Sequence, residues 1–453
     1  MKSPIWFTPL SALPMLVLCS ALFSQAQQPG GKIYEPIPAE FKIPGDKADQ
    51  ATLQHWVDSM NVKALRRHGW GLFAGLTYPS HRHRADADDV LPIWETWYSK
   101  EETFMPPSAA QPKQLSFKFP PAELAQTFHK SPEPIVSVAA RILFNQDAHD
   151  HIQGNCLYLR SKLMCLRNYP DGKSPAPEVP DFPPGSVTLK TSWMHVSQSK
   201  CTPIPVWDGE PGSPPGLDNS PSAWIRKVWV YAPGVSPDSC PKGTKGVPLK
   251  AFYHLKILSQ CEVKTWQSSE NVQVDPASGQ IEVNDYVVLV GFHAATRELP
   301  NWVWTTFWWH DRPDEGPYGS DRPPRVRGVW RHYLMDVAYD MDRPREHDSS
   351  PRIAFNPYLE GGIPGGVHSN CMTCHRRATF PNQSGVVTLD SDSADPVDET
   401  QIVVRGSVAA TATYLPDFDE RLWLHFVWSL AEATGPPPGP LPPACACTNQ
   451  PHD

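Results

Sequence analysis

Apolar and polar residues alternate over several short stretches in the middle of the chain, and this pattern predicts strands. The clearest stretch is Trp302–His310. Residues two positions apart share one face of a strand. One face of this strand should therefore carry Trp302, Trp304, Thr306, Trp308 and His310, with Trp309 and Asp311 on the other. Further strands are expected at Ser186–Val196, Ala223–Tyr231, Leu249–Leu258 and Ile281–Ala294.

Helical spacing of apolar residues is rarer. It is clearest from Gln50 to Arg67, and it predicts an amphipathic helix that ends near Gly69. Shorter helices are expected at Ala122–Phe128 and Pro134–Phe144. Near the C-terminal end, Asp417–Ala431 predicts a helix whose apolar residues are Leu422, Trp423, Phe426, Val427 and Leu430.

Composition and charge limit the kinds of fold and partner that we expect. The 52 prolines and 28 glycines favour short elements and long loops, while 40% hydrophobic residues argue against general disorder. Forty basic residues against 48 acidic ones give a net charge of −8, and no long basic run occurs. We therefore expect no nucleic-acid partner of the kind that is bound through its phosphate backbone.

The first 26 residues have the pattern of a cleavable export signal. Lys2 precedes an apolar run from Ile5 to Phe23, and a small-x-small motif then favours cleavage after Ala26. A retained anchor is the alternative, but prolines interrupt a run that is barely long enough to cross a bilayer. We expect a periplasmic or secreted protein with no stable membrane span after cleavage, because no later segment approaches the length of a spanning helix.

Cys371-Met372-Thr373-Cys374-His375 has the C-x-x-C-H pattern to which c-type haem attaches. On one helical turn, Cys371 and Cys374 can bind the two vinyl groups of a single porphyrin, which places His375 under the iron as proximal ligand. A thioredoxin-like redox pair normally follows a strand, whereas the glycine-rich segment 361–366 predicts a loop. A structural zinc site needs a second pair of ligands, and the sequence has none at suitable spacing.

Through Cys371, Cys374 and His375 the chain resembles the c-type cytochrome superfamily. The similarity covers about residues 355–435, where Asp417–Ala431 resembles the C-terminal helix that packs beside haem in small cytochromes c. The resemblance implies one covalently attached haem c, a small helical haem region, and single-electron transfer.

The sixth iron ligand departs from the pattern of that superfamily. Small cytochromes c usually take it from a downstream methionine, but the last of the nine methionines is Met372. Of the downstream histidines, His425 is expected on the solvated side of the predicted helix, and His452 lies in the tail. An upstream residue must therefore close the distal side, unless it is open. His310 is our main candidate there, followed by Met335, Met341, His332 and His368.

The distal side also decides between functions. Two strong ligands suit electron transfer, whereas an open or weakly ligated iron suits a haem enzyme, such as a peroxidase or oxidase, or a haem-based sensor. Residues 351–435 carry five arginines against ten acidic residues. We therefore expect a redox partner protein with a basic docking face.

The remaining cysteines predict disulfides in an oxidising compartment. Cys19 leaves with the signal and two cysteines hold haem, so an odd number remains and at least one should be left over within the chain. We expect a first bridge between Cys156 and Cys165 and one more among Cys201, Cys240 and Cys261. Cys445 and Cys447, in the tail, are expected to include the cysteine left over.

These observations predict an α+β fold with a β-rich, mostly antiparallel middle domain and a small helical haem region near the C-terminal end. We divide the chain into an export signal (1–26), a mixed or helical N-terminal region (27–175), a β-rich, Trp-containing domain (176–350), the haem c region (351–435), and a Pro-rich, disordered tail (436–453).

Overall fold

The computed structural model describes residues 34–41, 47–83, 90–106, 139–168, 177–209, 224–267, 280–338, 353–360, 370–375, 378–381, 421–433 and 445. All of them belong to one compact unit that begins at Tyr34. Across these ranges, no helix is both long and apolar enough to cross a membrane. The predicted export signal lies outside them.

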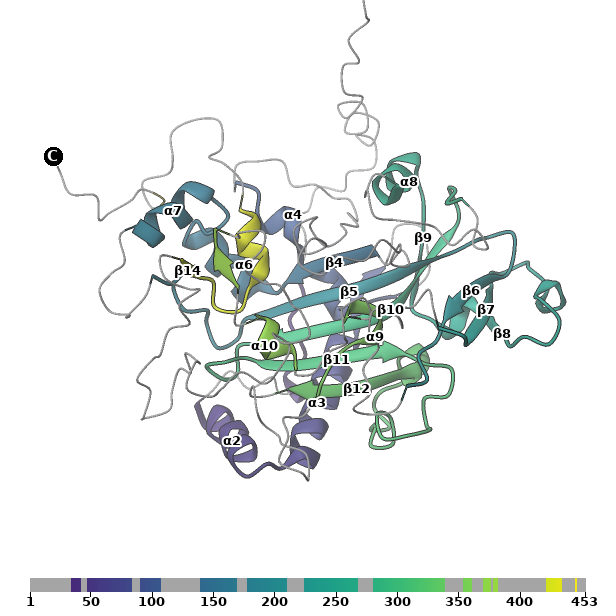
Figure 1. Cartoon of the computed structure of the whole chain (residues 1–453), viewed down its shortest axis with the longest axis horizontal. Coiled ribbons are helices and arrows are strands. Elements are labelled where there is room, and N and C mark those ends of the chain that lie inside the picture. Colours follow the sequence, from purple (N-terminus) through teal and green to yellow (C-terminus); the bar gives the residue numbers. More distant parts are fainter. Residues whose placement is uncertain are drawn as a thin grey trace, which may run out of the picture. The chain divides into compact units, whose positions relative to one another are not determined.

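A seven-stranded sheet forms the centre of the fold (Figure 1). Its order is β12-β11-β10-β5-β4-β3, and β9 pairs with the first residues of β10 on the β11 side. Every pair in this sheet is antiparallel. The strands are β3 (Tyr98–Ser99), β4 (Ala139–Phe144), β5 (Val187–Val196), β9 (His254–Lys256), β10 (Tyr286–Thr296), β11 (Val303–Trp309) and β12 (Tyr333–Ala338).

Three small sheets account for the other described strands. They contain β1 (Pro79–His83) with β2 (Val90–Pro92), β6 (Thr202–Pro205) with β7 (Lys227–Tyr231) and β8 (Gly246–Pro248), and β13 (Thr379–Phe380) with β14 (Leu422–Trp423). Among these pairs, β7 and β8 are parallel and the rest are antiparallel. The prediction of an α+β fold with mostly antiparallel sheets is confirmed.

The described helices are mostly short. They are α2 (Lys47–Asp58), α3 (Val62–Leu76), α4 (Lys100–Thr103), α6 (Gln146–Gly154), α7 (Arg160–Asn168), α8 (Gln260–Gln267), α9 (Pro357–Glu360) and α10 (Cys371–His375).

The predicted strands are found, with shifted ends. β5 and β11 match Ser186–Val196 and Trp302–His310 closely, and β10 starts later and ends later than expected. The other two predicted strands are shorter than expected. Of the predicted strand Ala223–Tyr231, the described strand is Lys227–Tyr231. The predicted strand Leu249–Leu258 divides into a 3-10 turn, Leu249–Ala251, and β9.

The helix predicted from Gln50 to Arg67 is two helices. The break lies at Met60, whose φ is +51°, and Asn61 caps the second helix through the backbone N–H of Ala64 at 3.1 Å. The expected end near Gly69 is wrong. A Cβ there would lie 3.0 Å from Val337 and 3.1 Å from Thr305, so glycine lets α3 pack closely on the sheet and continue past this point.

The helix predicted at Pro134–Phe144 is also wrong in its described part, because residues 139–144 form β4. This segment pairs with β5 over its whole length, from Ala139 opposite Trp193 to Phe144 opposite Thr188. Pairing inside the central sheet outweighs local helical spacing here. The predicted helix Ala122–Phe128 lies outside the described residues.

The two faces of the central sheet have different partners, as β11 shows. On one face, Phe307 stacks on Phe73 of α3 with 4.1 Å between ring centroids. On the other, Trp304 contacts His375 of α10, and Thr306 contacts the segment that leads into α9. Figure 1 shows α9 and α10 on the near face of the sheet, with α3 behind it. The alternation along β11 thus separates an α3 face from an α10 face.

The strands of the central sheet come from both sides of the boundary drawn at residues 175/176. β3 and β4 precede it, and β5 and β9–β12 follow it. The predicted Pro-rich tail also contributes to the packed structure, because Cys445 is 3% exposed and forms a disulfide with Cys156.

This disulfide corrects the pairing expected for Cys156. Cys165 is disulfide-bonded too, so Cys156–Cys165 is wrong, and Cys445 is not the leftover thiol of a free tail. Spacing along the sequence favoured the nearer partner, whereas packing brings together residues 289 positions apart.

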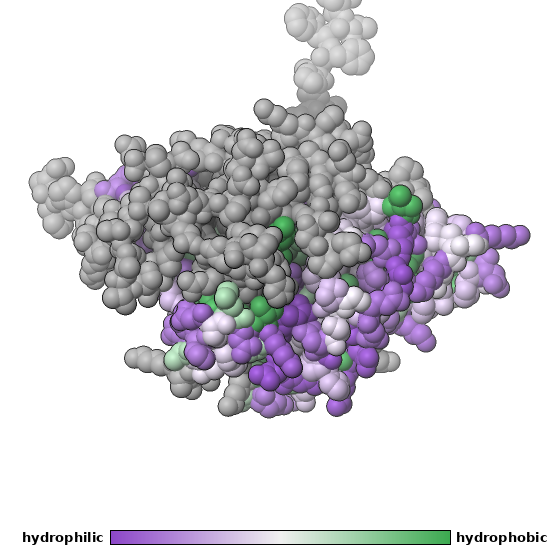
Figure 2. Space-filling model, turned by 60° about the horizontal axis from the view of Figure 1, so that its bottom comes forward, coloured by the Kyte–Doolittle hydropathy of each residue, from purple (hydrophilic) through white to green (hydrophobic). Residues whose placement is uncertain are grey.

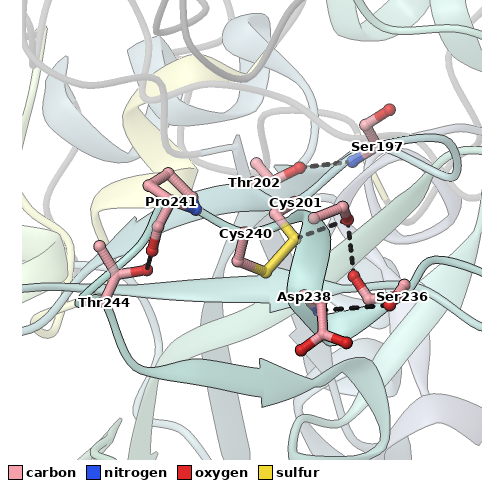
Figure 3. The surroundings of a disulfide bond; sticks show 9 residues. Ser197, Cys201, Thr202, Ser236, Asp238, Cys240, Pro241 and Thr244 are labelled. Carbon is pink, nitrogen blue, oxygen red and sulfur yellow. Dashed lines mark hydrogen bonds between the residues drawn. A yellow bond between two sulfur atoms is a disulfide. The ribbon is translucent and has the colours of Figure 1, made fainter.

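The second disulfide joins Cys201 and Cys240, a pair within the predicted set (Figure 3). The Ser239 hydroxyl lies 3.6 Å from Cys201 Sγ and donates to the Ser236 carbonyl at 2.6 Å. The bridge therefore ties the start of β6 to the turn that precedes β8.

The described surface in Figure 2 is mainly hydrophilic, and its hydrophobic residues form separate spots. The large hydrophobic residues with the most exposed side chains are also far apart in the sequence. They are Met60, Tyr78, Val90, Ile225 and Leu258.

Candidate functional site

The C-x-x-C-H residues form α10, a single helical turn that follows Asn370. The side-chain oxygen of Asn370 accepts a hydrogen bond from the backbone N–H of Met372 at 3.0 Å, which fixes the start of the turn. Met372 is fully buried in an apolar cluster, and Cys371 Sγ lies 3.8 Å from the carbonyl oxygen of Ala354. The side chain of Cys374 lies outside the described part.

His375, the last residue of α10, has a defined tautomer. Its Nδ1 lies 2.9 Å from the carbonyl oxygen of Phe426, and because a carbonyl only accepts, the Nδ1–H must donate. The ring also packs against Trp304, with 4.3 Å between centroids. Burial lowers the pKa of His375 to about 4, against the opposing effect of the Phe426 carbonyl. The imidazole is therefore neutral near pH 7, and Nε2 keeps its lone pair.

This state of His375 matches the chemistry of a metal-binding histidine. Such residues bind through one ring nitrogen and donate the other N–H to a carbonyl or carboxylate, which fixes the ring and raises the basicity of the ligating nitrogen. The partly buried imidazole, with Cys371 at the other end of the same turn, fits the donor set of a covalently attached haem.

The Phe426 carbonyl is brought to His375 by the chain that returns beside the motif. β14 pairs with β13, just after α10, and the backbone N–H of Leu424 donates to the Ala378 carbonyl at 2.9 Å. The helix predicted at Asp417–Ala431 is therefore wrong over its described residues, which form β14, a turn and a 3-10 helix at Trp428–Glu432. Backbone bonds to neighbouring strands replace the helical ones.

The expectation for His425 is wrong as well. It lies in the turn after β14 and is fully buried, rather than solvated on a helix. Its Nδ1 is 3.0 Å from Asp181 Oδ1 and its Nε2 is 3.4 Å from Glu178 Oε2. The helical spacing that placed it in solvent does not apply to a turn.

The segment before the motif is fixed to the α10 face of the sheet by Asn356. Its Nδ2 donates to Thr306 Oγ1 at 2.9 Å and to the Phe307 carbonyl at 2.8 Å, while its Oδ1 accepts from the N–H of Tyr358 at 3.0 Å. Gly291 permits this approach, since a Cβ there would lie 2.9 Å from Asn356 Oδ1.

The ionisable side chains of His293 and Glu360 lie beside the Asn356 segment on the α10 face. His293 Nε2 lies 2.8 Å from Glu360 Oε1, and the other Glu360 oxygen accepts from the backbone N–H of Asn356. Burial raises the pKa of Glu360, but the His293 ion pair and that hydrogen bond outweigh it and hold the pKa below its usual value. His293 and Lys190 are close enough to His375 to contribute to the lowering of its pKa.

His310, our sequence-based distal candidate, lies at the other end of β11 from Trp304. The two are six positions apart, a span of roughly 20 Å at about 3.3 Å per residue. His310 Nε2 is 3.2 Å from Asp208, and its Nδ1 accepts from the backbone N–H of Arg312 at 3.0 Å. The structure therefore does not bring His310 beside His375.

The other upstream candidates are also separated from α10 where the structure describes them. Met335 is buried on the α3 face, 3.6 Å from the Cβ position of Gly69. His332 stacks on Trp309, beside His310. Met341 and His368 lie outside the described residues.

Sequence reasoning missed the role of Phe426 and the presence of His293. A backbone carbonyl leaves no side-chain signal, so Phe426 could not be found from residue type. His293 does have one, because it falls inside the predicted strand Ile281–Ala294, on the face that carries polar residues of neighbouring strands: it is opposite Thr306 on β11 and Lys190 on β5.

Among the side chains that the structure describes, no three His, Cys, Asp or Glu residues converge as ligands for a metal ion. No protein family model, curated protein or solved structure matches this chain.

Proposed function

We propose that this chain is an exported monohaem c-type protein that transfers single electrons. Cys371 and Cys374 attach the haem and His375 is the proximal ligand of its iron. The observation that carries the proposal is the hydrogen bond from His375 Nδ1 to the Phe426 carbonyl at 2.9 Å, which leaves the lone pair of Nε2, on a neutral and partly buried imidazole, to bind a metal. When bound, haem supplies a reversible one-electron change at iron.

The chain's own residues would then hold the ligand and its surroundings. Trp304 and the Phe426 carbonyl fix the plane and tautomer of His375. The scaffold would be a face of a large antiparallel sheet rather than the small helical bundle of the cytochromes that the motif resembles. Export agrees with the Cys156–Cys445 and Cys201–Cys240 disulfides, which persist in oxidising compartments.

A haem enzyme or sensor with an open distal side is the second candidate. The observation that favours it is the His293–Glu360 pair, with Lys190, close enough to affect His375. Such groups can move protons or hold a polar ligand, which electron transfer alone does not require.

Replacement of two histidines tests the proximal assignment. In His375→Ala the absorption spectrum of the haem protein should lose the signature of the histidine ligand, because Nε2 is removed. In the control His310→Ala the spectrum should be unchanged, because this side chain bonds to Asp208 and Arg312 instead. An unchanged spectrum in His375→Ala contradicts the assignment.

Added ligands separate the two candidate functions. Iron that is low-spin in both oxidation states and binds neither carbon monoxide nor cyanide supports electron transfer. High-spin ferric iron that binds them supports the enzyme or sensor.

The acidic balance of residues 351–435, −5 before any haem, supports a redox partner with a basic docking face. The rate of electron transfer to such a partner should fall as salt is added, because salt screens the attraction. A rate that rises with salt contradicts this part of the proposal.

A further inference from the structure

The turn that presents the Phe426 carbonyl has an unusual backbone. His425 has φ +48° and Phe426 has φ +70°. Residues other than glycine rarely adopt this left-handed region, and bulky ones do so least. Two in succession persist only where surrounding contacts hold them. The conformation of this turn must therefore be stabilised by its neighbours.

The contacts that hold the turn converge on His425. Its ring stacks on Trp423, with 4.5 Å between centroids and 29° between planes. Its two nitrogens lie near carboxylate oxygens, Asp181 at 3.0 Å and Glu178 at 3.4 Å, in electrostatic contacts that lack hydrogen-bond geometry. The His425 side chain is fully buried, whereas the side chain of Asp181 is 45% exposed.

The two carboxylates belong to a strap, residues 177–182, that is itself anchored. It runs beside β14, with the Val179 N–H donating to the Trp423 carbonyl at 3.0 Å and the Trp423 N–H to the Pro177 carbonyl at 2.9 Å. His151 Nε2 of α6 lies 3.0 Å from the Pro180 carbonyl, and Arg297, just after β10, lies 3.5 Å from Asp181. The strap thus connects His425 to the core of the fold.

We propose that His425 is a positioning residue that holds the Phe426 carbonyl against the Nδ1–H of His375. The order of contacts runs from the strap to the His425 ring, from that ring to the left-handed turn, and from the turn to His375. The consequence for iron rests on the proposed function above. A carbonyl held in place raises the basicity of Nε2, and this favours ferric over ferrous iron.

His425→Asn tests this role, because asparagine tolerates a positive φ but is too short to reach both carboxylates. The matched control is His254→Asn, a half-buried histidine on β9. In the full-length chain produced without haem, the ¹⁵N shifts of the His375 ring should report the Nδ1–H form. They should report a mixture of tautomers in His425→Asn and no change in His254→Asn. In the haem-loaded protein, the reduction potential should shift upward only in His425→Asn.

Glu178→Gln keeps the test decisive if His425→Asn does not fold, since it removes one charge with little change in size. It should shift both readouts in the same direction by a smaller amount. Unchanged ¹⁵N shifts in a folded His425→Asn or Glu178→Gln chain overturn the positioning role. Absence of haem from the wild-type protein would overturn the proposed function instead, and the ¹⁵N result would still decide the role of His425.

Discussion

The two faces of the central sheet differ in the kind of residue that covers them. On the α3 face, β11 presents Phe307 to the aromatic residues of α3, and Phe307 is fully buried between them. On the α10 face, the same strand presents Trp304 to His375 and Thr306 to the amide of Asn356. Around β11, the α3 face is packed by aromatic side chains, and the buried Arg141–Glu95 ion pair lies farther along the same face, at β4. The α10 face holds histidine, carboxylate and amide groups beside β11 itself.

This difference separates residues that mainly stabilise the fold from residues that could also take part in chemistry. Apolar stacking stabilises the fold and needs no particular partner, whereas buried polar groups are retained only when each finds a hydrogen bond or a charge. The buried Asn356 meets this condition through the β11 backbone, and the partly buried His375 and Glu360 meet it through the Phe426 carbonyl and His293. We therefore expect substitutions on the α3 face to change stability alone and those on the α10 face to change the haem site as well.

The largest effect on stability is expected for Phe307→Ala. The substitution removes a ring that stacks on Phe73 at 4.1 Å and lies 5.8 Å from Trp70, so the free energy of unfolding should fall by about 3–5 kcal/mol. Denaturant titration measures this loss. The reduction potential of the proposed haem should be unchanged, and a shifted potential with little loss of stability would contradict the division between the faces.

A smaller loss is expected for Asn356→Asp, on the α10 face. The carboxylate cannot donate to Thr306 or the Phe307 carbonyl, which should lower the free energy of unfolding by about 1–3 kcal/mol. Here the reduction potential should also fall, because the added negative charge favours ferric iron. Redox titration of the variant checks this, and a potential equal to that of the wild type would count against it.

The smallest effect concerns pH and the pair formed by Asp285 and His195, 2.7 Å apart. Burial raises the pKa of Asp285, but the hydrogen bonds from His195 and from the N–H groups of Gln198 and Glu282 outweigh it and lower the pKa. The folded-state pKa is thus below the unfolded value of about 3.9. The stabilisation is present above that value and is lost as pH falls through the folded-state pKa.

Asp285→Asn should therefore flatten the pH dependence of stability. The free energy of unfolding, measured from about pH 6 down to about pH 3, should fall less steeply in the variant than in the wild type. Equal slopes would mean that Asp285 is not the group that titrates.

The sequence predicts the strands of the central sheet better than the segments that cover its α10 face. Alternating apolar residues identify β5, β10 and β11, because burial in a sheet imposes a period of two. The same reasoning fails at 421–431, where apolar spacing suits a helix but pairing with β13 and the strap forms a strand and a left-handed turn.

The candidate site is likewise predictable only in part. The spacing of Cys371, Cys374 and His375 is visible in the sequence because the proposed haem attachment requires that spacing. The Phe426 carbonyl contacts a residue 51 positions away, and the contact between His425 and Asp181 joins residues 244 positions apart, which no local pattern records. His310 was chosen because it ends an aromatic row, but position along a strand does not say which end the motif contacts.

The most direct test of the central claim is the mass of the peptide that contains Cys371–His375, taken from the mature exported protein. The account predicts that this peptide carries one haem, bound through both thiols. The same peptide without haem, with Cys371 and Cys374 as thiols or joined to each other, would contradict it.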